Sequence, residues 1–172
     1  HWSIYYLSFS SGLDKQLYYP FMDALIPIYT SILKNFEQVH IDEPAFSSTN
    51  IDLFDIKIIS SFYEKLSKNT GTKINIFSFG KFPCYWMSDL NVNGIGMNFI
   101  DNSENFDYFD FKTDKTVFSG FINDNKLTKK QIEQIKKIDK KIDNLYICNS
   151  KALSKYKNYE KILENFNQLE GI

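Results

Sequence analysis

The sequence contains no arginine, two cysteines, four prolines and seven glycines, and each scarcity narrows the range of functions. Arginine is the usual residue for bidentate recognition of phosphate and carboxylate groups, so its absence argues against a site built on that contact. Cys84 and Cys148 lie far apart in the sequence, and two thiols do not make a disulfide framework. We therefore expect a reduced, cytoplasmic protein.

Net charge and long apolar runs are also scarce. The 172 residues carry a net charge of −1, which gives no field to steer the chain toward nucleic acid or an anionic membrane. No apolar run approaches the roughly 18–20 residues that span a bilayer, and the first residues lack the features of a signal peptide. We expect no nucleic-acid partner and no membrane partner. Because the sequence starts without Met and inside a predicted strand, we expect a fragment or a chain whose front is missing.

The sequence is rich in apolar and aromatic residues, at 43% and 17%, which is typical of a folded domain. Strand-like segments alternate with helix-like segments, and this alternation predicts an α/β fold of parallel βαβ units. The predicted strands are residues 4–9, 38–42, 73–79, 92–100, 116–122 and 145–148. The predicted helices are residues 20–36, 51–69, 128–142 and 158–169.

These six strands predict a (β/α)8 TIM-type barrel with about six of its eight strands present, as a single domain over residues 1–172. An open doubly wound sheet is the main alternative, but no glycine-rich phosphate loop follows any predicted strand. A barrel short of two strands leaves unpaired edges. We expect them to be covered by missing upstream strands or by a homodimer, or the barrel to be locally opened.

The segment from Val39 to Ala45 (VHIDEPA) holds the main candidate site. A short apolar strand ends there in two adjacent carboxylates, and in a parallel barrel this end of the strand is the catalytic face. Alternation along a strand places His40 and Asp42 on one side, so we expect Asp42 at the mouth and His40 hydrogen-bonded to a carboxylate. The alternative is a strand end whose acids cap the next turn. The predicted substrate-binding residues are Asp42, Glu43 and His40.

The same segment resembles the IDEPAL strand of cobalamin-independent methionine synthase, in which the aspartate holds the amino group of homocysteine. Four further segments resemble later parts of that barrel and follow in the same order. Residues 74–80 are similar to its next strand, 90–100 to its LPVDGLxLDLV strand and 117–123 to its LSAGVVDG strand, and 148–153 fall where its last strand enters the closing loop. Together they cover nearly the whole chain from Pro20 onward.

The resemblance implies that the zinc ligands of the catalytic barrel are replaced here. Its His-x-Cys pair falls at Phe77 and Phe79, its Glu at Asn98 and its last Cys at or near Lys151. Neither a phenyl ring nor a protonated amine can bind zinc. The family's aspartate is likewise an amide at Asn123. We therefore expect no metal, no cofactor and no catalytic residue.

Strand alternation suggests how the site was converted. Gly94, Gly96 and Asn98 share one face of their strand, where the glycines leave room for the rings of Phe77 and Phe79. An amide at position 98 needs only hydrogen bonds, whereas a buried carboxylate without a metal would be an unpaired charge.

Three interpretations follow. The first is a non-catalytic barrel, comparable to the front half of methionine synthase, that supports or assembles with a separate catalytic barrel. The second is an active methyltransferase-family enzyme with altered, metal-free chemistry, in which Asp42 and Glu43 hold a small amino-acid-like or thiol substrate. The third is an unrelated α/β domain that matches these short motifs by chance.

Overall fold

The computed structural model describes residues 12, 14–43, 53–78, 87, 89–108, 113–150 and 155–170. Within this part of the chain five parallel strands form one sheet, in the order β1-β2-β3-β4-β5. The strands are β1 (Gln38–Asp42), β2 (Lys73–Ser78), β3 (Gly94–Asn98), β4 (Thr116–Ile122) and β5 (Leu145–Asn149). Each strand pairs with the next one in the sequence, whereas the strand order of a doubly wound sheet reverses. The predicted α/β fold is confirmed, and the order favours a barrel; closure of the barrel stays a prediction.

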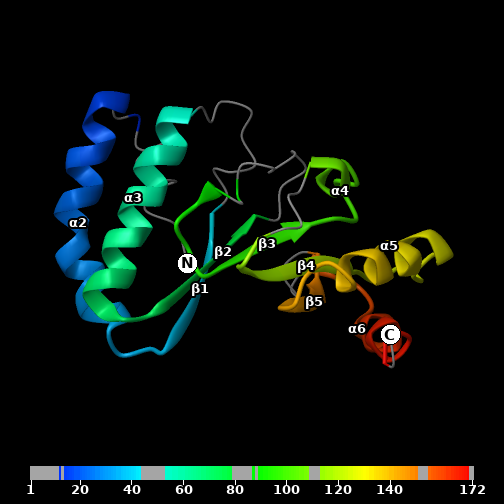
Figure 1. Ribbon diagram of the computed structural model, residues 1–172. Helices are drawn as coiled ribbons and strands as arrows, with labels where there is room; N and C mark the ends of the chain where they lie inside the picture. The colour runs from blue at the N-terminus through cyan, green and yellow to red at the C-terminus, as the bar shows by residue number, and fades with distance from the viewer. Residues whose placement is uncertain are drawn as a thin grey trace.

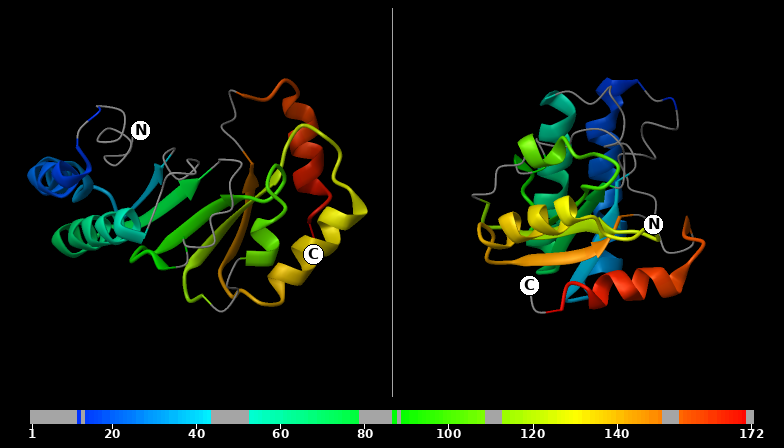
Figure 2. Two further views of the ribbon diagram at one scale, coloured as in Figure 1. Left: turned by 90° about the horizontal axis from the view of Figure 1, so that it is seen from above. Right: turned by 90° about the vertical axis from the view of Figure 1, so that its right-hand side faces the viewer.

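Helices precede or follow the strands at both ends of the sheet. They are η1 (Lys15–Leu17), α2 (Tyr18–Leu33), α3 (Leu53–Thr70), α4 (Asn105–Tyr108), α5 (Lys129–Asp139) and α6 (Tyr159–Asn167). Figures 1 and 2 show α2 and α3 together at the β1 end, and α5 and α6 at the β5 end. Local signals set several boundaries: α3 stops at Gly71, whose φ of +70° suits glycine, and α5 begins with a Thr128–Gln131 capping box. None of the helices described has the length and apolar character needed to cross a membrane.

The hydrophobic core lies between the sheet and its helices. Ile76, Ile95 and Val117 are side by side on three neighbouring strands, and all three are fully buried. They belong to one cluster with Ile59 of α3 and Ile135 of α5. Burial of such β-branched rows under helices is the usual environment of a parallel sheet.

The structure shortens one predicted strand. Residues 92–100 were expected to be extended, but β3 begins at Gly94. The backbone N–H of Val92 donates to the carbonyl of Leu90 at 2.9 Å, and Oδ1 of Asn93 accepts the N–H of Ile74 at 3.0 Å. These contacts form a turn that leads into the strand. The strand predicted at residues 4–9 lies outside the described residues.

Candidate functional site

One face of the sheet carries the predicted site residues, and it is the face opposite the hydrophobic core. Strand pairing places five residues side by side across it: Asp42, Phe77, Gly96, Phe118 and Tyr146. We call this set the inner row. His40 precedes Asp42 by two residues, so it shares this face with the row.

Aromatic rings fill most of the inner row. The ring of Phe77 lies 5.0 Å from that of Phe118 and 5.2 Å from that of His40, measured between centroids. His40 also contacts Phe118 edge-on at 5.0 Å, and Tyr146 stacks on Phe118 at 5.3 Å. Phe77 and Phe118 are buried, whereas Tyr146 is exposed. Such tilted and edge-on contacts stabilise an aromatic cluster beyond simple burial.

The glycines of β3 provide the space for these rings. A Cβ on Gly96 would lie 2.2 Å from Cδ1 of Phe77, and a Cβ on Gly94 would lie 2.9 Å from Cε2 of Phe118. The predicted fit between these glycines and the ring of Phe77 is therefore confirmed. Large side chains come from β2 and β4 and none from β3, which is the alternate-strand filling of a barrel interior.

His40 differs from its prediction in its hydrogen-bond partner. The side-chain amide of Gln38 lies 3.1 Å from Nε2 of His40, and no carboxylate is hydrogen-bonded to the ring among the described residues. Partial burial lowers the pKa of His40, while the negative charge of Asp42 opposes that change. A neutral imidazole that accepts from an amide fits both observations.

The two adjacent carboxylates do not share one environment. Asp42 is exposed on the inner face, whereas Glu43 is fully buried on the side of α2 and α3. The backbone N–H of Glu43 donates to the carbonyl of Phe77 at 2.9 Å and prolongs the pairing of β1 with β2. Alternation along the strand separates the side chains, so the three predicted substrate-binding residues are not brought into one site.

Glu43 instead faces two tyrosines that the sequence did not indicate. Burial, and then the negative charge of Glu43, hold the pKa of Tyr63 well above its ordinary value; a hydrogen bond to Glu43 acts in the same direction. Burial and the same carboxylate raise the pKa of Tyr29. Tyr63 follows Ile59 by one helical turn and so falls on the core side of α3, which is the one sequence signal that could have found it.

Asn98 and Asn123 each stabilise a local turn after a strand. Oδ1 of Asn98 accepts the N–H groups of Ile100 and Asp101 at 3.0 Å each, and its Nδ2 donates to the carboxylate of Asp101 at 2.8 Å. Oδ1 of Asn123 accepts the N–H of Asn125 at 2.9 Å. Both amides have the hydrogen bonds of an Asx-type turn.

The remaining candidate ligands give no metal centre in the described part of the chain. No three side chains of His, Cys, Asp or Glu lie together there. Burial raises the pKa of the Cys148 thiol to about 12, so it is protonated at neutral pH. The predicted positions Phe79 and Lys151, and Cys84, lie outside the described residues.

Comparison with known proteins gave one match of note. A family model described as the N-terminal domain of cobalamin-independent synthase matches residues 3–146. No curated protein matches the chain. The matched range contains β1 to β4, the start of β5 and the whole inner row.

Proposed function

The chain belongs to the cobalamin-independent synthase N-terminal domain family, and we propose from this membership that it is a non-catalytic barrel of the methionine synthase family. The family resemblance drawn from the motifs, including its assignment to the front half of the enzyme, is confirmed. An unrelated α/β domain is excluded. What the chain does within the family is the content of the proposal.

Phe77 carries the proposal. The resemblance aligns it with a zinc ligand of the catalytic barrel, and its ring is buried over Gly96 between His40 and Phe118. A phenyl ring offers no lone pair to zinc. Packed rings at this position suit a filled barrel interior, in which side chains stabilise the fold and leave no space for a reacting group.

The role of such a barrel would be structural support for a catalytic barrel. That role is consistent with the chain's own polar residues, because Asn98 and Asn123 spend their amides on local turns. A sedimentation experiment with a separately expressed catalytic barrel of methionine synthase tests it. We expect a joint boundary, and two independent boundaries would contradict the supporting role.

One observation favours a second candidate function. Asp42 is exposed on the inner face beside His40, and an exposed carboxylate there could hold the amino group of a small substrate. This candidate is the metal-free enzyme, which would use Asp42 without Glu43.

Calorimetric titration with homocysteine separates the two candidates. For a non-catalytic barrel we expect no binding heat from the wild-type chain. Micromolar binding that is lost in Asp42→Asn, and kept in the matched control Asp139→Asn on the exposed surface of α5, would establish the second candidate.

A further inference from the structure

Helix α2 has an apolar side in addition to the one that packs on the core. Met22 and Leu33 are buried on the core side, with Tyr29 partly buried beside them. The exposed positions of the helix are uncharged throughout: Tyr19, Pro20, Ala24, Pro27, Ile28, Ser31 and Ile32. Surface helices normally carry charged residues on the side away from the core.

The exposed apolar residues form a stripe. Ile28 and Ile32 are one turn apart and 55% and 51% exposed, and Leu17 lies three turns before Ile28. Phe36, just after the helix, is 53% exposed. We call Leu17, Ala24, Ile28, Ile32 and Phe36 the α2 flank. Clustered exposed apolar residues of this kind mark interaction surfaces.

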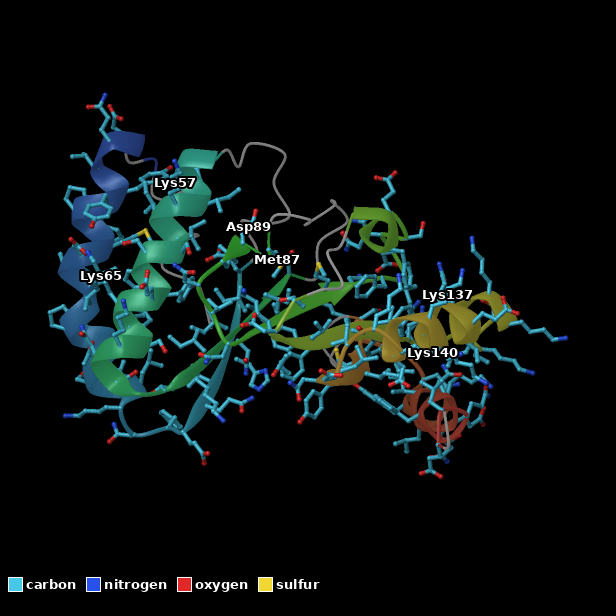
Figure 3. The ribbon with its side chains drawn as sticks, in the orientation of Figure 1. Lys57, Lys65, Met87, Asp89, Lys137 and Lys140 are labelled. Atoms are coloured by element: carbon cyan, nitrogen blue, oxygen red, sulfur yellow. The ribbon has the colours of Figure 1, made fainter. Side chains whose placement is uncertain are left out.

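Helix α3 occupies a different side of α2. Lys65 of α3, labelled in Figure 3, forms an ion pair with Asp23 at 2.7 Å and donates to the hydroxyl of Tyr19 at 2.9 Å. Asp23 and Ile28 are about 140° apart around the helix axis, at about 100° per residue. The α2 flank therefore points away from α3, where the described chain provides no neighbour.

We propose that a second copy of this chain covers the α2 flank, with the two α2 helices packed antiparallel about a twofold axis. In such an isologous contact the same patch meets itself, so any charge near the axis faces a like charge. The α2 flank has none. A partner recognised by charge would find nothing to pair with, whereas a second copy supplies a matching aliphatic stripe.

The other end of the molecule does not suit the same contact. Helix α5 exposes Lys136 and Lys137, and Lys140 follows at its end; two of the three are labelled in Figure 3. Two copies meeting there would bring lysines together and repel each other. The charge distribution thus selects the α2 end for self-association. This inference does not depend on the proposed function, because a dimer is compatible with either candidate.

Light scattering across a dilution series tests the proposal. We expect the wild-type chain to have about twice its monomer mass of 20.2 kDa, and the double substitution Ile28→Lys, Ile32→Lys to halve it. Leu163→Lys on α6 is the matched control, since Leu163 is 63% exposed and should leave the dimer unchanged. A wild-type monomer, or an equal effect of the control, overturns the proposal. So does a mass that grows beyond the dimer.

A cross-linking variant keeps the test independent of disruptive charges. Ala24 is small, exposed and near the middle of the stripe, so Ala24→Cys in a Cys84→Ser background should form a disulfide-linked dimer under mild oxidation. Leu163→Cys in the same background should remain a monomer on a non-reducing gel. Cross-linking of both variants alike, or of neither, contradicts the proposed contact.

Discussion

Replacing Gly96 with alanine should destabilise the chain, although alanine in a strand is normally more stable than glycine. The added Cβ would lie 2.2 Å from Cδ1, 2.5 Å from Cε1 and 2.7 Å from Cγ of Phe77. Ordinary carbon–carbon contacts are about 3.5–4.0 Å, so the ring must move. Its neighbours His40 and Phe118, at 5.2 and 5.0 Å, restrict that movement.

The magnitude follows from two opposing effects. Alanine gains about 0.5–1 kcal/mol from reduced backbone entropy of the unfolded chain, whereas overpacking costs about 1–3 kcal/mol. We therefore expect a net loss of about 1–2 kcal/mol, which lowers Tm by about 2–8 °C for a domain of this size. Urea unfolding followed by circular dichroism measures it.

A double-mutant cycle isolates the cause. In a Phe77→Ala background the added methyl group has room, so Gly96→Ala should be neutral or slightly stabilising there. Equal destabilisation in both backgrounds would refute the packing argument. A stabilised single variant, Gly96→Ala alone, would refute it as well.

Three further predictions concern buried polar groups. Asn165→Ala should cost about 1–3 kcal/mol in urea unfolding, since its buried amide donates to the carbonyls of Asn123 and Asn125 at 2.8 and 2.6 Å; the exposed Asn167→Ala should cost little. Cys148, with its pKa raised to about 12, should be alkylated at pH 8 about 100–1,000-fold more slowly in the folded than in the urea-unfolded Cys84→Ser variant, and equal rates would contradict its burial. The raised pKa of Tyr63 stabilises the fold fully below pH 10 and progressively less above it, so the stability advantage of wild type over Tyr63→Phe should shrink above pH 10; a constant difference would be the contrary result.

Period-two alternation made much of the sheet predictable. The bounds of β1 and β4 agree with those expected, because each is a compact apolar run bounded by polar residues or a turn. The fit of Gly96 to Phe77 followed from the same alternation, since both residues lie at inward positions of adjacent strands. Neighbouring-strand register is therefore readable from sequence where glycines oppose rings.

The position of Glu43 was not predictable in the same way. Its burial depends on Tyr29 and Tyr63, which come from two different helices, and on the packing of those helices against the strand end. Local sequence contains no information on which helix side faces a given strand end. Two adjacent acids therefore read as one site, although strand geometry points them to opposite faces.

The content of zinc in the purified chain tests the central claim most directly. After expression in zinc-supplemented medium and removal of loosely bound metal, elemental analysis should find far less than one zinc ion per chain. Stoichiometric zinc that survives dialysis against a weak chelator would contradict the account, because it would require a ligand set at the position where Phe77 is packed.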